Sequence, residues 1–272
     1  MIRTGDEEEA VSFDLYGRRV LVTGASSGIG AGLAAAFAAA GATVGICARR
    51  EDRLREVLGR CAAFTPSSRM WVTDLSRPEE VARLALAAVD ELGGVDVLVN
   101  NAGIPKRRHV TALDTATVEA VHRLNFISPV QLTLALLPQM LQRGEGRIVN
   151  VSSVAATLSS PGEAAYAASK AALTVWSEGM AVDLWDTGVR VLVVYPGVVD
   201  TELFTLPDND PFTAAVEAIT VDECVEAVMD AFNKDALEVY VPAWFGDVAK
   251  RKASDVPAFL SGTAEYVRQQ RS

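Results

Sequence analysis

The chain has 272 residues, half of them hydrophobic, and a formal net charge of −10. This length suits one large α/β domain with a sizeable core, and the acidic balance disfavours nucleic acid and anionic membranes as partners. The three cysteines are an odd number without metal-ligand spacing, which indicates free thiols in a reducing, cytoplasmic compartment. Every apolar stretch of about 18 residues is interrupted by charges or helix breakers, so we expect no integral membrane association.

Short runs rich in β-branched residues alternate with helical stretches rich in Ala and Leu. In chain order, we expect strands at 19–23, 43–48, 70–73, 95–99, 147–151, 189–195 and 238–241. The helices expected between them lie at 28–40, 51–60, 78–92, 113–143, 164–187 and 222–233. Several strand runs are apolar throughout, which favours strands buried on both faces of a parallel sheet. The alternation predicts right-handed βαβ units and a three-layer α/β sandwich of Rossmann type, with helices on both faces.

The sequence shows no repeat or linker, so we expect residues 1–272 to form a single domain whose core spans 17–242. The acidic start, residues 1–15, lacks the apolar segment of a signal peptide. It is expected to be a flexible leader, with a regulatory or partner-binding tail as the alternative. Region 196–221 has Pro, Asp and Asn clusters, which are typical of a long substrate loop with a short helix. The extension 243–272 could cover the site, join an oligomer interface or touch a membrane surface.

The first expected strand runs directly into a glycine-rich turn, Thr23–Gly30, and then into an alanine-rich helix. Gly24 permits the tight turn, Gly28 lets the backbone approach a pyrophosphate, and Gly30 allows close packing of helix and strand. The pyrophosphate would then meet free N–H groups at the helix N-terminus. The spacing G-x3-G-x-G differs from the G-x-G-x-x-G fingerprint, but its place between strand and helix favours a dinucleotide site over a purely structural turn.

The end of the second expected strand, Ala48-Arg49-Arg50, indicates which dinucleotide binds. An NAD enzyme usually places an acid there to bind the ribose 2′-hydroxyl. Ala48 carries no carboxylate that would repel a 2′-phosphate, and the Arg49 guanidinium can bind such a phosphate in bidentate fashion. Glu51 and Asp52 fit better as acids of the first helical turn. We therefore expect NADP(H) as cofactor, with NAD less favoured; two solvated arginines are the structural alternative.

Two later strand ends supply further candidate contacts to the cofactor. Asp74, before Leu75, could accept a hydrogen bond from the adenine amine or cap the next helix, for which Ser76 is the better cap. The fourth strand ends in small residues that would let the backbone lie against the adenosine ribose, although an Asn-rich turn is also common in ordinary loops. The small residues at that fourth strand end are Asn101, Ala102 and Gly103.

Tyr166 and Lys170 lie four residues apart in an Ala-rich helical stretch, so their side chains share one face. A free phenol has a pKa of about 10. A nearby ammonium and an oxidised nicotinamide would lower it, so that Tyr166 could exchange a proton with the substrate oxygen. Ser153 could hydrogen-bond that oxygen, whereas the adjacent Ser152 would point to the opposite side of the strand. Asn125, an amide in an apolar stretch, needs a partner and could hold a water linked to Lys170.

Taken together, these motifs resemble the short-chain dehydrogenase/reductase family, in order and in spacing, from about residue 17 to 242. The resemblance rests on Thr23–Gly30, Asn100–Gly103, Asn125, Ser153, Tyr166, Lys170 and the run Pro196-Gly197-Val198-Val199-Asp200-Thr201. It implies sheet order 3-2-1-4-5-6-7, a catalytic tetrad of Asn125, Ser153, Tyr166 and Lys170, and a contact from Lys170 to the nicotinamide ribose. It also implies that Val199 and Thr201 hold the carboxamide and a nearby phosphate. Family members are commonly homodimers or homotetramers that pack through the helices expected here at 113–143 and 164–187.

The expected function is NADP(H)-dependent hydride transfer between nicotinamide and a carbonyl or alcohol carbon of a small organic substrate. The alternatives are an NAD-dependent alcohol dehydrogenase of the same fold and an NADP-binding sensor that has lost its chemistry. The candidate cofactor contacts are Gly24, Ser26, Ser27, Gly28, Ile29, Gly30, Arg49, Arg50, Asp74, Leu75, Asn101, Ala102, Gly103, Tyr166, Lys170, Pro196, Gly197, Val199 and Thr201.

The substrate pocket is expected from segments 104–110, 154–162 and 202–221. The basic run Lys106 to His109 could attract an acidic substrate, but a solvated charged loop is the favoured interpretation. His109 and His122 are not set among acids at ligand spacing, so we expect no metal site.

Overall fold

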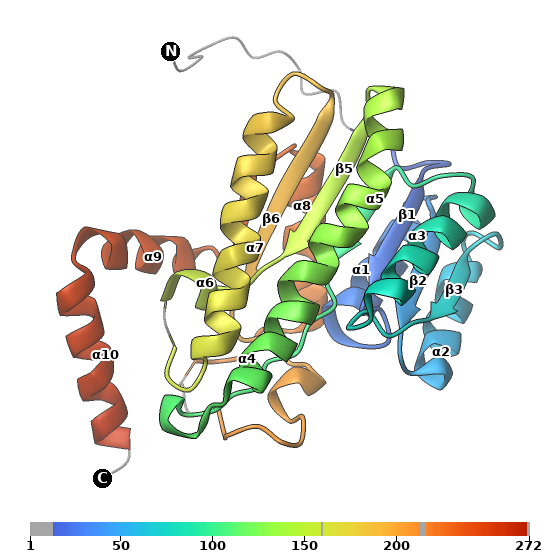
Figure 1. Cartoon of the computed structure of the whole chain (residues 1–272). Helices are drawn as coiled ribbons and strands as arrows, with labels where there is room; N and C mark the ends of the chain where they lie inside the picture. Colours follow the sequence, from blue (N-terminus) through green and yellow to red (C-terminus); the bar gives the residue numbers. More distant parts are fainter. Residues whose placement is uncertain (1–12, 159, 213–215, 271–272) are drawn as a thin grey trace.

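The computed structural model describes residues 13–158, 160–212 and 216–270. Figure 1 shows a parallel sheet with helices on both faces. The seven strands are β1 (Arg19–Thr23), β2 (Thr43–Ala48), β3 (Arg69–Val72), β4 (Val97–Asn100), β5 (Gly146–Val151), β6 (Val189–Pro196) and β7 (Glu238–Val241). Their order in the sheet is β3-β2-β1-β4-β5-β6-β7, and every neighbouring pair is parallel. The predicted fold class and strand order are confirmed.

The helices of the Rossmann core are α1 (Gly28–Ala39), α2 (Glu51–Ala62), α3 (Pro78–Leu92), α4 (Thr115–His122), α5 (Ser128–Arg143), α6 (Ala155–Leu158), α7 (Ala164–Asp183) and α8 (Val221–Asn233). Two helices follow β7, namely α9 (Trp244–Ser254) and α10 (Val256–Gln270). Short irregular turns lie at η1 (Val110–Ala112), η2 (Arg123–Ile127) and η3 (Glu202–Phe204).

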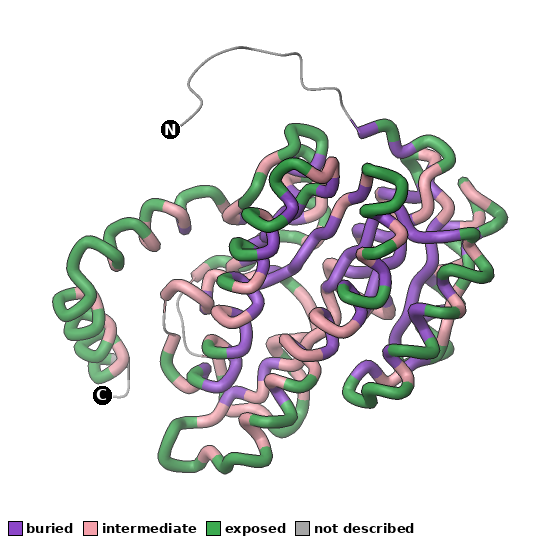
Figure 2. The backbone as a smooth tube through the Cα atoms, turned by 45° about the horizontal axis from the view of Figure 1, so that its top comes forward, coloured by how far each residue is buried: buried purple, intermediate pink, exposed green. Residues whose placement is uncertain are grey.

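Successive residues of a strand point to opposite faces of the sheet, so each buried strand contributes to two cores. Val20 and Val22 of β1 pack in the core that includes residues of α1, α2 and α8, whereas Leu21 between them packs in the core that includes α3, α5 and α7. Figure 2 shows that burial is concentrated in the strands and in the helix faces that cover them. This three-layer arrangement explains why the strands are apolar throughout.

The predicted helix 113–143 is interrupted by a wider turn. The chain forms α4, then the π-helical segment η2, then α5. Single π-helical turns often occur at functional sites, and this one contains Asn125. Together, Thr115–Arg143 is long and apolar enough to cross a membrane by length and composition, with a mean hydropathy of 1.3. Its apolar residues have another explanation, because Leu132, Leu136 and Met140 are buried in the core beneath it.

The core begins earlier in the chain than the predicted boundary at residue 17. Phe13 and Leu15 are buried, and the Phe13 ring packs edge-on against Phe232 with 5.8 Å between centroids. The predicted leader is therefore wrong for these two residues, and residues 1–12 lie outside the described chain. At the other end, the described part of the extension forms α9 and α10. Figure 1 shows α10 standing away from the sheet layers, and Figure 2 shows it largely exposed.

Candidate cofactor and catalytic site

A cavity of about 350 Å³ lies at the carboxyl ends of the strands. Loops that follow β1, β2, β3, β4, β5 and β6 all contribute to its wall, as expected for a parallel sheet at the point where the strand order reverses. Nearly all of the predicted cofactor and catalytic residues line it, from Ser26 and Arg49 at one end to Tyr166 and Lys170 at the other. Gly30 and Asn125 are the two predicted residues that do not line the cavity and instead lie behind its wall.

The glycine-rich turn after β1 is shaped by close backbone packing. Gly24 has a φ of +66°, and a Cβ there would lie 2.7 Å from the Cα of Ala102. Gly28 has a φ of +55° and faces the Thr201 methyl, and a Cβ on Gly30 would overlap the Asn101 amide. The Asn101 amide donates hydrogen bonds to the carbonyls of residues 23 and 24, at 2.9 and 3.2 Å. The three glycines therefore allow the turn to pack closely against the loops after β4 and β6, and the turn faces the cavity with small residues and serine hydroxyls, which fit a dinucleotide phosphate.

The two arginines after β2 have different environments. Arg50 donates from Nη2 to the hydroxyls of Ser26 and Ser27, at 3.0 and 2.7 Å, and from Nη1 to Glu202 at 2.6 Å. Arg49 is exposed and lines the cavity. The structure thus brings both arginines to the cavity and fixes Arg50 against the glycine-rich turn.

Asp74 lies at the cavity wall, where it organises its own loop. Its Oδ1 accepts hydrogen bonds from the backbone N–H and the hydroxyl of Ser76, at 3.0 and 2.7 Å. Burial would raise the pKa of the Asp74 carboxyl, but these hydrogen bonds and the charges of Arg49 and Arg77 hold it below its usual value. The predicted helix cap was wrong, because α3 begins after Arg77 without a side-chain cap and the Ser76 hydroxyl binds Asp74 instead.

The side chains predicted to be catalytic gather at the far end of the cavity. Tyr166 and Lys170 lie on one face of α7, with the Lys170 Nζ 5.8 Å from the centre of the tyrosine ring. The Lys170 ammonium donates to the carbonyl of Val151 at 2.7 Å. Ser153 follows β5 and hydrogen-bonds the Tyr166 hydroxyl. Ser152 points the other way, as predicted, and its hydroxyl donates to the Lys170 carbonyl at 3.1 Å.

Asn125 is fully buried in the π-helical turn and binds protein groups on both sides of its amide. Its Oδ1 accepts from the N–H of Ile104 at 2.9 Å, and its Nδ2 donates to the Ile104 carbonyl and the Ser169 hydroxyl, each at 3.0 Å. A Cβ on Gly103 would lie 3.2 Å from Asn125 Oδ1 and 3.5 Å from Lys170 Nζ. The amide therefore holds the loop after β4 in place beside Lys170.

Burial dominates the electrostatics of this end of the cavity. It lowers the pKa of Lys170 to about 8. It also raises the pKa of Tyr166, as does the Glu163 carboxylate, while the Ser153 hydrogen bond and the Arg107 charge act in the opposite direction. Among the protein's own groups, desolvation of the phenolate outweighs the favourable contributions, and the expected effect of an oxidised nicotinamide lies outside this balance.

Two charged residues near Tyr166 escaped the sequence prediction. Glu163 lines the cavity one helical turn before the tyrosine, and burial raises the pKa of its carboxyl. Arg107 is 3% exposed, so the prediction of a solvated loop was wrong for this residue. Its Nε and Nη2 donate to the carbonyls of Asp210 and Phe204, at 3.1 and 2.9 Å. The i, i+3 spacing of Glu163 and Tyr166 was a usable signal, whereas nothing in the sequence linked Arg107 to a loop 100 residues away.

The other members of the basic run and the two histidines are accounted for locally. Lys106 and Arg108 both form ion pairs with Asp208. His109 caps η1, and His122 lies against a backbone carbonyl of its own helix. Within residues 13–158, 160–212 and 216–270, no three His, Cys, Asp or Glu side chains gather as a metal centre would require.

Comparison with known proteins agrees with this geometry. The family model for short chain dehydrogenases matches residues 18–210. A short chain dehydrogenase from Pseudocercospora fijiensis is 39% identical over 203 residues, which are 74% of this chain and 65% of that protein's length. Dehydrogenase/reductase SDR family member 7B from Mus musculus is 32% identical over 256 residues, covering 92% of this chain and 76% of that protein.

Among solved structures, a short-chain dehydrogenase from Sphingobium yanoikuyae in complex with NADPH has a TM-score of 0.78 at 29% identity, covering 89% of this chain and 95% of that one. A short chain dehydrogenase/reductase from Burkholderia phymatum in complex with NAD shares the fold, with a TM-score of 0.81 at 21% identity over 90% of this chain and 96% of that one. With the family model matching most of its length, the chain belongs to the short-chain dehydrogenase/reductase family of oxidoreductases.

Proposed function

We propose that the protein is an NADP(H)-dependent oxidoreductase that interconverts a carbonyl and an alcohol on a small organic substrate. The observation that carries the proposal is that Tyr166, Ser153 and Lys170 line the same cavity as the glycine-rich turn after β1. Bound along this cavity, the dinucleotide would supply or accept the hydride. The intact tyrosine and lysine argue against a binding protein that has lost its chemistry.

The proton of the reaction is assigned to Tyr166. Its hydroxyl donates a proton to the substrate oxygen during reduction and takes it back during oxidation. Ser153, hydrogen-bonded to Tyr166, orients the same oxygen. Lys170, whose pKa burial lowers to about 8, carries its positive charge at neutral pH beside the ring and can favour the phenolate. Asn125 acts as a positioning residue, because it holds the backbone of Ile104 next to Lys170.

The cofactor preference is supported by the charges at the end of β2. Ala48 offers no carboxylate to the ribose 2′ position, while Arg49 and Arg50 bring two positive charges to the cavity. Asp74 and Leu75, one strand further along the sheet, are proposed to lie against the adenine. An NAD-dependent alcohol dehydrogenase remains the alternative, since solved proteins with this fold are known in complex with NADPH and with NAD.

Dissociation constants of NADPH and NADH test this assignment directly. A charge-assisted hydrogen bond contributes about 1.5–3 kcal/mol, which is roughly 10- to 150-fold in affinity. Arg49→Ala should weaken NADPH by about this factor and NADH much less, and Ala48→Asp should reverse the preference. A wild type that prefers NADH, or an Arg49→Ala variant that loses both cofactors equally, contradicts the NADP assignment. Turnover of ketones and alcohols with each cofactor then identifies the substrate class.

We also propose that the protein is cytoplasmic and forms a homodimer or homotetramer. Large apolar side chains are exposed on α5 and α7, and a stripe of such residues on neighbouring helices favours self-association. The exposed residues on these helices are Leu134, Leu141, Val175 and Val182, and the exposed Trp185 follows the end of α7. Sedimentation of the dilute, fully active protein as a monomer of 28.9 kDa would contradict the oligomer.

A further inference from the structure

The carboxylate of Glu202, in the substrate loop, forms ion pairs with Arg50 and Arg53 beside the cofactor site. Glu202 directly follows Thr201 in η3, and its Oε2 accepts from Arg50 Nη1 at 2.6 Å. Its other oxygen lies 3.5 Å from Arg53 Nη2. The loop after β6 is thus joined to the start of α2, across the rim of the cavity that both elements line.

The same guanidinium reaches the start of α1. Arg50 donates to the hydroxyls of Ser26 and Ser27 while it holds Glu202, and Glu202 itself hydrogen-bonds Ser27. Helix α1 has no acidic residue in its first turn, and Ser27 makes no capping hydrogen bond. Helix N-termini favour a negative charge, and Glu202 brings one to this point from another part of the chain. An arginine, two serine hydroxyls and a helix start are the groups that would bind a phosphate.

We propose that Glu202 is a selectivity residue of the cofactor site, whose carboxylate occupies Arg50 and Ser27 until the ribose 2′-phosphate displaces it. This inference rests on the proposed NADP function. The 2′-phosphate is favoured over the pyrophosphate because Arg50 lies at the end of β2, next to Arg49, where the adenosine ribose is expected. Displacing Glu202 costs the ligand little free energy, because Arg50 and Glu202 are both more than 40% exposed and exposed ion pairs are weak.

Displacement of the Glu202 carboxylate would also change the loop that lines the substrate half of the cavity. Leu203, Phe204 and Leu206 follow Glu202 and line that half. Arg107 holds the Phe204 carbonyl, so the loop keeps one anchor when the other is released. Binding of the 2′-phosphate is therefore expected to release the start of η3 at Glu202, while Arg107 still holds the carbonyl of Phe204 at its end. This couples the cofactor site to the residues that contact the substrate.

The test uses the full chain and two probes that differ only in the 2′-phosphate, adenosine 2′,5′-bisphosphate and adenosine 5′-monophosphate. Glu202→Gln keeps the side-chain shape and removes the competing charge. It should bind the bisphosphate about three- to fivefold more tightly by titration calorimetry, and the monophosphate less than about twofold more tightly. Glu51→Gln, which removes a negative charge from the start of α2, directly after Arg50, should change neither affinity by more than about twofold. In an Arg50→Ala background, Glu202→Gln should bring no gain.

Hydrogen exchange supplies a readout that does not depend on affinity. In wild type, the bisphosphate should speed exchange at the amides of Phe204 and Thr205, which bond within η3, and in Glu202→Gln it should not. Equal gains for both probes place Glu202 against another phosphate and overturn the inference, as does no gain. Failure of every variant to bind either probe overturns the dinucleotide function itself, whereas normal binding without a Glu202 effect overturns only the role of Glu202.

Discussion

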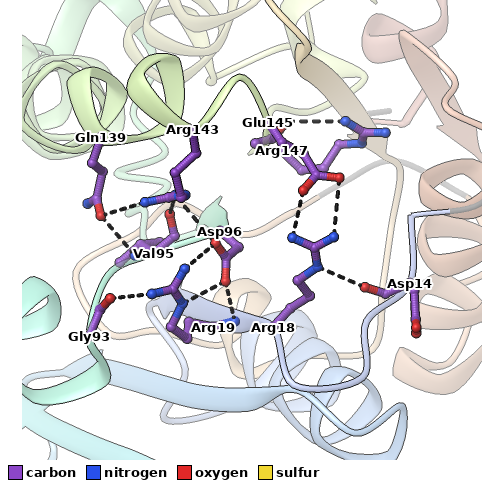
Figure 3. Close-up of polar contacts among 11 residues, drawn as sticks. Asp14, Arg18, Arg19, Gly93, Val95, Asp96, Gln139, Arg143, Glu145 and Arg147 are labelled. Carbon is purple, nitrogen blue, oxygen red and sulfur yellow. Dashed lines mark hydrogen bonds and ion pairs between the residues drawn. The ribbon is translucent and has the colours of Figure 1, made fainter.

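Near the amino ends of β1 and β4, a buried carboxylate is paired with arginines, whereas near Tyr166 the buried charged groups of the described chain form no ion pair. Figure 3 shows Asp96 receiving hydrogen bonds from the backbone and guanidinium of Arg19, at 2.9, 2.7 and 2.6 Å. Arg143 approaches the same carboxylate at 3.4 Å. Burial alone would raise the pKa of Asp96, but these arginines hold it below its usual value, so the group stays charged.

Near Tyr166, burial acts without such compensation. No ion pair within the described chain includes Lys170 or Glu163. Burial lowers the pKa of Lys170 and raises the pKa of Glu163, so in both groups the neutral form is favoured. Perturbed groups of this kind cluster at functional sites. The difference indicates that ion pairs at the amino end stabilise the fold, whereas the charged groups beside Tyr166 lack such partners and can interact with ligands.

The largest expected effect is at Tyr166. Tyr166→Phe removes only the hydroxyl, so turnover should fall by about 10²–10⁴-fold, the usual contribution of a general acid–base group. NADPH affinity and the free energy of unfolding should change little by comparison. Single-turnover hydride transfer with chemistry rate-limiting measures the effect. A variant with near wild-type rates would refute the assignment of the proton to Tyr166.

The corresponding substitution at the amino end is Asp96→Asn, which removes the carboxylate from the buried ion pair with Arg19. Removing one partner of a buried ion pair typically costs about 3–5 kcal/mol, because the remaining charge is left uncompensated. We expect a loss at the lower end of this range, since Arg19 is about one-quarter exposed. Urea denaturation measures it. Turnover per folded molecule should be unchanged, and a variant that folds normally but loses activity would contradict the division between the two ends.

The parallel sheet could be predicted from the alternation of apolar strands with helices, and this places the candidate loops at one edge of the sheet. The strand order was expected from the resemblance to the short-chain dehydrogenase/reductase family. The meeting of Gly24 and Ser153 follows from parallel topology, in which the carboxyl ends of strands share one edge, and α7 brings Tyr166 to the same cavity. The π-helical turn at Asn125 was missed, since one wider turn hardly disturbs a helical pattern. Arg107 was assigned to solvent because its partners lie in a loop about 100 residues later. Contacts between distant loops leave no periodic signal.

A smaller effect is expected from Lys170, whose contribution to the free energy of unfolding depends on pH. Burial lowers its pKa from 10.5 to about 8 in the folded protein. Between these values the unfolded chain binds more protons, so the free energy of unfolding rises with pH. Compared with Lys170→Met, wild type should therefore gain about 3 kcal/mol of stability from pH 7 to 11, in chemical denaturation. The comparison with the variant cancels the titration of other groups. A difference that stays constant with pH would show that the ammonium is not desolvated.

The smallest effect is expected within the amino end itself, where burial differs between two ion pairs. Arg18 binds Glu145 in bidentate fashion at 2.7 and 3.2 Å, but the side chains are 31% and 45% exposed. Exposed pairs of this kind contribute about 0–1 kcal/mol and weaken with salt. Glu145→Gln should therefore lower the free energy of unfolding by less than about 1 kcal/mol, far less than Asp96→Asn.

A double-mutant cycle in urea isolates this pair from other contacts of Arg18. The Arg18 guanidinium also lies over the Phe13 ring, 4.6 Å from its centre. Arg18→Met keeps an apolar stem on that ring, so the cycle with Glu145→Gln reports mainly the ion pair. The coupling should shrink from dilute buffer to about 0.5 M salt, where the Debye length falls to about 4 Å. If the coupling matches the loss in Asp96→Asn and resists salt, then burial is not what separates strong pairs from weak ones at this end of the sheet. Pairing alone would then explain the stability of the amino end, and the contrast with Lys170 and Glu163 would rest on missing partners rather than on desolvation.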